Sequence, residues 1–182
     1  LLGGLSADRH PAASGPRVAR TFMFTDIVKS TNLVEAIGDE AWADLLRWHD
    51  RTLRSLFAKH GGEEIDHAGD GFFVAFADVA SSVECAVAIQ RRLFEHRRTH
   101  GFAPQVRIGL HEAEATRQGA TYRGRGVHEA ARISALAEGG EILASAKTLV
   151  DAGVRFPTSA GRTVELKGIA EPVELATVDW RT

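Results

Sequence analysis

Hydrophobic and polar residues alternate with two different periods along the first half of the chain. The apolar residues of segment 18–25 suit a buried strand, and Asn32 with Glu35 three residues later is typical of a capping box that begins a short helix. From Asp39 the apolar residues recur at helical spacing on one face, and Gly61-Gly62 ends this longer helix. The pattern therefore predicts one strand followed by two helices.

The middle of the chain predicts a hairpin and a third helix. Strands are expected at about 63–68 and 71–76, joined through the segment "AGDG". An Asp-Gly pair between two β-like runs is a strong hairpin signal. Asp78 caps the helix that follows, and segment 105–115 is typical of another strand.

The last third of the chain predicts shorter elements. They are a glycine-rich loop at 117–126, a helix at 127–137, strands at 141–145, 162–168 and 172–180, and a short helix at 146–151. The order is thus β-α-α-β-β-α-β, then α-β and further strands. This order predicts an α+β fold in which helices pack on one face of an antiparallel-rich sheet.

Composition narrows the classes of function. The chain has 182 residues, which is enough for one domain. Residues 1–17 are rich in Gly, Ala, Ser and Pro, so we expect a flexible linker or tail before the domain at 18–182. A net charge of −2 argues against general binding to nucleic acid or an anionic membrane, and no apolar run is long enough to span a bilayer. A single cysteine, Cys85, fits a reducing compartment, so we expect a cytoplasmic location. Because the chain opens at Leu1, flanking regulatory domains in a longer chain are also expected.

Two acidic residues are candidates for a metal site. Asp26 follows the first strand, and Asp70 lies in the hairpin turn, so both emerge at one edge of the sheet if these strands are neighbours. Mg²⁺ prefers oxygen ligands and commonly takes one or two carboxylates plus substrate phosphates. Aspartate is also a common structural residue in such turns, so the spacing alone leaves both interpretations open.

Five segments in order resemble the catalytic domain of class III nucleotidyl cyclases: "FTDIVKST", "AGDG", "VRIGLH", "VHEAARIS" and "LKG". The resemblance covers about residues 18–179. It implies a ferredoxin-like βααββαβ core with additional C-terminal strands, and a homodimer with active sites at the subunit interface. The implied reaction converts a nucleoside triphosphate into a 3′,5′-cyclic nucleotide and pyrophosphate.

The resemblance also implies roles for individual residues. Asp26, Asp70 and the carbonyl of Ile27 match the ligands of two Mg²⁺ or Mn²⁺ ions per site. Arg132 matches the arginine that stabilises the transition state, and Lys167 matches a lysine that binds the triphosphate.

Several positions depart from the adenylyl cyclase pattern. Asp66 stands where a lysine donates to adenine N1, and His128 stands where an asparagine holds the ribose; Thr121, at the second base-reading position, is compatible with adenine. A carboxylate facing N1 sets two acceptors against each other, at about 2–4 kcal/mol or roughly 30- to 1000-fold against ATP. Guanine instead presents N1–H and N2–H₂ donors. Lys29 stands where many members carry glycine.

We therefore expect an adenylate cyclase with reduced activity that converts ATP to cyclic AMP at a homodimer interface. Two alternatives stay open: a catalytically weak or inactive module that binds nucleotide or regulates a partner, and a cyclase that prefers GTP. The expected partners are a nucleoside triphosphate and a second copy of the chain, with no nucleic acid and no membrane.

Overall fold

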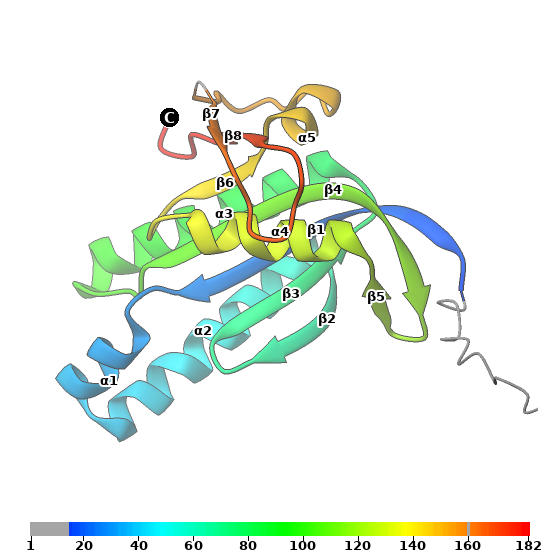
Figure 1. Cartoon of the computed structure of the whole chain (residues 1–182). Helices are drawn as coiled ribbons and strands as arrows, with labels where there is room; N and C mark the ends of the chain where they lie inside the picture. The colour runs from blue at the N-terminus through cyan, green and yellow to red at the C-terminus, as the bar shows by residue number, and fades with distance from the viewer. Residues whose placement is uncertain (1–14, 160) are drawn as a thin grey trace, which may run out of the picture.

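The structure, a computed structural model, describes residues 15–159 and 161–182. Within these residues, eight strands form one sheet in the order β2-β3-β1-β4-β6-β8-β7, with β5 paired to β4 (Figure 1). Neighbouring strands are antiparallel, except that β4 and β6 are parallel. The elements are β1 (Arg17–Ile27), α1 (Ser30–Ile37), α2 (Asp39–Lys59), β2 (Glu63–Ala68), β3 (Gly71–Phe76), α3 (Val79–His100), β4 (Val106–Gln118), β5 (Thr121–Arg123), α4 (Arg125–Leu136), β6 (Ile142–Ser145), α5 (Ala146–Asp151), β7 (Arg162–Val164) and β8 (Val173–Thr177).

The predicted α+β class and the βααββαβ order are confirmed. The hairpin strands begin and end at the predicted residues, and Asp78 caps α3 by accepting a hydrogen bond from the backbone N–H of Ser81 at 2.8 Å. β1 begins at Arg17, and most of the expected tail, residues 1–14, lies outside the described residues. No helix in the described ranges combines the length and apolarity needed to cross a bilayer.

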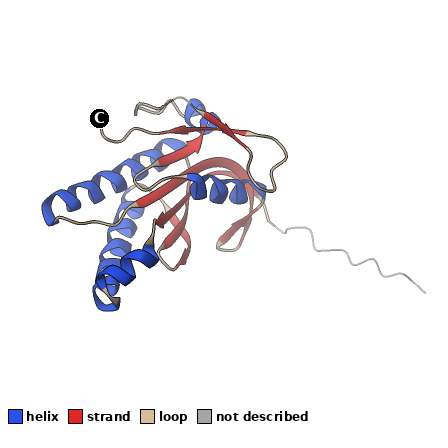
Figure 2. Cartoon of the chain, turned by 60° about the vertical axis from the view of Figure 1, so that its left-hand side comes forward, coloured by secondary structure: helices blue, strands red, loops and turns tan. Residues whose placement is uncertain are grey.

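Helices cover both faces of the sheet, which corrects the expectation of one covered face. Ile108 and Leu110 of β4 belong to the main apolar core, together with residues of α2 and α3. Gly109 lies between them and faces α4, because a Cβ on Gly109 would lie 2.5 Å from the Cα of Ser134. Since successive strand residues point to opposite faces, α4 packs on the face away from α2 and α3 (Figure 2).

The expected capping box at Asn32 is wrong, because α1 begins at Ser30. The N-cap residue Lys29 has φ 55° and ψ 36°, and no side chain caps the helix. Lys29 is the sole non-glycine residue of the described ranges with a positive φ. This left-handed residue turns the chain sharply from β1 into α1, a conformation that glycine adopts more readily than lysine.

Replacing Lys29 with glycine should stabilise the domain by about 0.5–1 kcal/mol. Glycine adopts the left-handed region without steric cost, which outweighs the entropy that glycine loses on folding. Urea unfolding measures the difference. The matched control is Lys29→Ala, which removes the same side chain but keeps the Cβ, and it should give no gain. Equal stability of the two variants would show that the left-handed backbone at position 29 does not destabilise the domain.

Candidate active site

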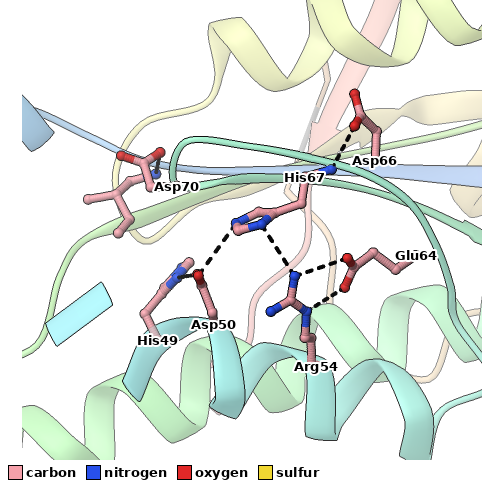
Figure 3. Close-up of polar contacts among 8 residues, drawn as sticks. His49, Asp50, Arg54, Glu64, Asp66, His67 and Asp70 are labelled. Carbon is pink, nitrogen blue, oxygen red and sulfur yellow. Dashed lines mark hydrogen bonds and ion pairs between the residues drawn. The ribbon is translucent and has the colours of Figure 1, made fainter. Parts of the chain in front are cut away.

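The structure brings Asp26 and Asp70 together at one edge of the sheet. β1 and β3 are antiparallel neighbours, and the last residues of β1 lie beside the turn that carries Asp70. The backbone N–H of Ile27 donates to Oδ1 of Asp70 at 3.3 Å. Oδ1 of Asp26 lies 3.9 Å from the position that a Cβ on Gly71 would occupy. Asp70 is labelled at the upper left of Figure 3.

The two carboxylates repel each other in the absence of a cation. Burial, a hydrogen bond to Asp26 and the negative charge of Asp26 together raise the pKa of Asp70 to about 7, although the N–H of Ile27 and the hydroxyl of Ser30 act in the opposite direction. A divalent cation between the two groups would relieve this repulsion, so the residues present fit such an ion. In the described part of the chain no three His, Cys, Asp or Glu side chains are grouped to hold a metal. An ion here would take its other ligands from the backbone, water or a substrate, as Mg²⁺ commonly does.

Arg107 is a residue of this region that the sequence reasoning missed. It lies directly opposite Asp26 in the register of β1 and β4, and its Nη2 donates to Oδ2 of Asp26 at 2.9 Å. Its Nη1 donates to the carbonyl oxygen of Ala135 at 3.1 Å. The one signal in the sequence is its place in "VRIGLH". The contact itself could not be predicted, because it depends on the register between strands that are distant in the chain.

Asp66 lies on β2 beside a small apolar cavity. It is exposed, and its Oδ1 accepts a hydrogen bond from the backbone N–H of His67 at 2.9 Å. The cavity of about 150 Å³ is also lined by Phe24 and Phe73, whose rings stack with centroids 4.5 Å apart. An acceptor beside a flat apolar surface could receive the edge of a planar heterocycle.

A polar cluster under β2 fixes the hairpin that carries Asp66 and Asp70 (Figure 3). His67, on the opposite face of β2 from Asp66, lies 3.5 Å from Oδ2 of Asp50 and accepts from Nη2 of Arg54 at 3.3 Å. Arg54 also donates to both oxygens of Glu64, at 2.7 and 3.1 Å. Asp50 and Arg54 belong to α2, so the hairpin is tied to a long helix.

The other expected site residues lie apart from the carboxylate pair. His128 and Arg132 are exposed, one turn apart on α4; Thr121 begins β5, and Lys167 is exposed in the turn after β7. Within the described ranges, no hydrogen bond or ion pair joins these four residues to the carboxylate pair. One chain therefore carries two separate groups of candidate residues.

A partly buried chain of hydrogen bonds seats α4 on the sheet. His111 of β4 contacts Oε2 of Glu129 through Nε2 at 2.7 Å and the Ser145 hydroxyl through Nδ1 at 2.8 Å. Burial lowers the pKa of His111, more than Glu129 raises it. Because a carboxylate only accepts, the neutral ring donates from Nε2 to Glu129 and accepts at Nδ1 from Ser145.

Comparisons with known proteins agree on one family. The family model described as "Adenylate and Guanylate cyclase catalytic domain" matches residues 15–177. A receptor-type adenylate cyclase of Trypanosoma congolense is 30% identical over 201 residues, which cover 85% of this chain but only 27% of that protein.

Two solved structures have closely similar folds. The adenylyl cyclase CyaB from P. aeruginosa superposes with a TM-score of 0.80 at 24% identity, over 90% of this chain and 95% of that one. The guanylyl cyclase Cya2 superposes with a TM-score of 0.80 at 25% identity, over 90% and 93% of the two chains. Structural likeness therefore does not favour one nucleotide over the other.

Proposed function

Since the chain belongs to the family of adenylate and guanylate cyclase catalytic domains, we propose that it converts ATP to 3′,5′-cyclic AMP and pyrophosphate, at a reduced rate. The observation that carries this proposal is the convergence of Asp26 and Asp70, because burial and the neighbouring Asp26 raise the pKa of Asp70 to about 7. Paired acids of this kind are suited to divalent ions that bind a triphosphate.

Asp26, Asp70 and the carbonyl of Ile27 would hold two Mg²⁺ or Mn²⁺ ions. When bound, such ions supply charge that stabilises the attacking and leaving oxygens of a phosphoryl substitution. Asp70 must lose its proton to act as a ligand, so its raised pKa makes metal affinity increase as the pH rises through about 7.

We propose that each active site is built from two chains related by a two-fold axis. Asp66 lies on the same face of the sheet as α4, since it lines the cavity with Phe24 and Phe73, whose apolar cluster includes Ala130 of α4. Asp66, Thr121, His128 and Arg132 of one chain would face the carboxylate pair of the other. Such an arrangement gives two equal sites.

The exposed residues of α4 would act on the substrate directly. The guanidinium of Arg132 would donate hydrogen bonds to the negative charge that develops on the α-phosphoryl group, and Lys167 would bind the triphosphate. His128 would donate to the ribose and orient the 3′-hydroxyl. The oxygen of that hydroxyl attacks the α-phosphorus and releases its proton to solvent, the bond to the β-phosphate oxygen breaks, and pyrophosphate leaves with the electron pair of that bond.

A preference for GTP is the second candidate, and the position of Asp66 favours it. The carboxylate stands beside the stacked rings of Phe24 and Phe73, where it would accept from the N1–H and N2–H₂ groups of guanine. The hydroxyl of Thr121 would donate to O6. Asp66 and His128 weaken the case for fast turnover of ATP. An inactive nucleotide-binding or regulatory module is therefore the third candidate. A cytoplasmic location and flanking domains stay predictions from the sequence.

A parallel assay with ATP and GTP tests the proposal. Purified protein with Mn²⁺ should form cyclic AMP from ATP, and the ratio of kcat/KM for the two triphosphates decides the substrate. Cyclic GTP as the main product would establish the second candidate. The third candidate predicts a different result. Calorimetry would then show metal-dependent binding of nucleotide, while no cyclic nucleotide forms at high protein concentration. That result would overturn the proposal that the chain is an active cyclase.

A further inference from the structure

Two histidines near the end of α3 carry imidazole rings that lie side by side. His96 and His100 stand four residues apart on the helix, and their rings stack with centroids 4.2 Å apart and planes 12° from parallel. His96 also lies against the ring of Trp48 on α2, with the two centroids 3.9 Å apart. The outer ring, that of His100, is exposed to solvent. The pair is therefore held by the fold on one side and open on the other.

The hydrogen bonds of both rings leave Nε2 as the atom with a lone pair. Nδ1 of His96 lies 2.9 Å from the carbonyl oxygen of Phe102, and because a carbonyl only accepts, this Nδ1 carries the proton. Nδ1 of His100 lies 2.8 Å from the Thr99 hydroxyl, which itself donates to the carbonyl of Glu95 at 3.0 Å. The hydroxyl therefore accepts from Nδ1–H of His100. A neutral imidazole with Nδ1–H bonded and Nε2 free is a form that commonly binds metal ions.

The charges around the two rings decide which ions they suit. Arg97 and Arg98 stand between the histidines in the chain, and Arg98 engages the carboxylate of Glu95 at 2.8 and 3.1 Å. A hard ion such as Mg²⁺, which depends on oxygen ligands, is therefore disfavoured here. Imidazole nitrogen instead suits Zn²⁺, Ni²⁺ and Cu²⁺. The partial negative charge at the C-terminal end of a helix favours a cation and offsets part of the repulsion from the arginines.

We propose that His96 and His100 bind a transition-metal ion, Zn²⁺, Ni²⁺ or Cu²⁺, through their two Nε2 atoms, with water in the remaining positions. One ion needs both lone pairs to point at it, so the rings must open from their parallel stack. His100 can turn because it is exposed and is the last residue of α3, while Trp48 and the Phe102 carbonyl hold His96. The site uses none of the candidate catalytic residues and is independent of the proposed function.

An ion at this site would also restrain the connection between α3 and β4. His96 already donates to the carbonyl of Phe102, and metal binding at Nε2 makes Nδ1–H a stronger donor. Further along the same connection, the carbonyl of Gln105 accepts from the N–H of Val28 at 2.9 Å. The ion would therefore stabilise the last turn of α3 together with segment 101–105.

Calorimetry with Ni²⁺ alone, on protein without an affinity tag, tests the site. We expect the ion to bind the parent and Asp70→Asn alike, since that variant removes the carboxylate pair as a competing site. His96→Gln and His100→Gln should each raise the dissociation constant at least about 10-fold, because one imidazole cannot chelate. The matched control is His60→Gln, since His60 belongs to the end of α2 and should not affect binding.

A spacing variant separates chelation from the mere number of histidines. Adding Arg98→His to His100→Gln restores the number but places the second histidine two residues from His96, where helical side chains do not face each other. This double variant should bind Ni²⁺ as weakly as His100→Gln alone. Affinity restored to that of the parent would overturn the chelate.

The fluorescence of Trp48 locates the bound ion. Ni²⁺ quenches indole emission at short range, and the ring of Trp48 lies against that of His96. Ni²⁺ should therefore lower the emission of the parent, and this decrease should be lost in Trp48→Phe and in His96→Gln. The other two tryptophans, Trp42 and Trp180, remain in both variants as internal references.

The outcomes decide the site without reference to cyclase activity. Ni²⁺ binding that both histidine variants weaken, together with quenching that requires Trp48, would establish it. Equal affinity of the parent and His100→Gln, or quenching that persists in Trp48→Phe, would overturn it. Because none of these measurements uses a nucleotide, either result leaves the proposed function to its own assay.

Discussion

Asp70→Asn should abolish cyclic nucleotide formation and, at the same time, make the metal-free protein more stable above neutral pH. The loss of activity should reach at least ~10³-fold, because a neutral amide cannot replace a carboxylate ligand whose ion stabilises phosphoryl charge. The metal-free variant should be more stable because it lacks the negative charge of Asp70, which is unfavourable beside Asp26 in the folded state. A residue that is costly to the fold but required for activity is typical of a functional site.

The sign of the pH effect follows from the raised pKa of Asp70. In the unfolded chain this carboxyl ionises near 3.8, and in the folded chain near 7. Between these values the folded state holds a proton that the unfolded state has lost, so the stability of the parent falls as the pH rises. The stability of Asp70→Asn should not fall in this way, because the amide carries no ionisable proton. Because Asp70 is half-buried, solvent screening reduces the expected difference to about 1–2 kcal/mol above pH 7, and it should vanish below pH 4.

Denaturant unfolding without metal, at several pH values, measures this difference. Mn²⁺ should raise the Tm of the parent more at pH 8 than at pH 6, and should leave Asp70→Asn unchanged. Asp44→Asn is the matched control, since Asp44 is an exposed aspartate of α2. A variant that keeps its activity, or that is less stable than the parent at pH 8, would contradict the assignment of Asp70.

Asp66→Lys should shift the preference between nucleotides toward ATP by roughly 30- to 1000-fold in kcat/KM. Lysine replaces an acceptor with a charged donor that suits adenine N1 and opposes the N1–H of guanine. Asp66 is exposed on an edge strand, so the substitution should fold as the parent does. Adding His128→Asn should raise kcat with ATP further, because the shorter amide matches the family's ribose contact.

Two substitutions at the same position separate charge from shape. Asp66→Asn keeps the length of the side chain and removes its charge. It should change the ratio of kcat/KM for ATP to that for GTP far less than Asp66→Lys does. Asp66→Glu lengthens the acceptor and should favour GTP. Parallel assays with both triphosphates decide the matter: a ratio that stays within about threefold for all three variants would show that Asp66 does not read the base.

The elements that the sequence predicts correctly are those whose determinants are local. The hairpin bounds were predicted correctly, because Asp70-Gly71 specifies a tight turn between its own flanking strands. The start of α1 was predicted wrongly, because the backbone of Lys29 takes a conformation that its residue type does not indicate. β5 was missed inside a glycine-rich loop, because its three residues gain their strand geometry from pairing with β4.

The same distinction applies to the candidate site. The closeness of Asp26 and Asp70 could be predicted, because each stands at the end of a recognisable strand. The contact of Arg107 with Asp26 could not, since its place in "VRIGLH" does not indicate a partner, and only the register of β1 against β4 places it opposite Asp26. The face on which α4 packs was equally hidden, because the glycine that admits the helix lies within an apolar run.

The central position of β1 has a consequence for how the domain folds. Its partners β3 and β4 come much later in the chain, and the bond between Asp26 and Arg107 spans 81 positions. Such distant pairing gives a high contact order, which slows folding because loop entropy is lost before the contacts form. On a ribosome, one edge of β1 stays open until residue 118 has emerged. Asp26 can meet Asp70 as soon as β3 has emerged, whereas the pairing with β4 that places Arg107 beside Asp26 follows later.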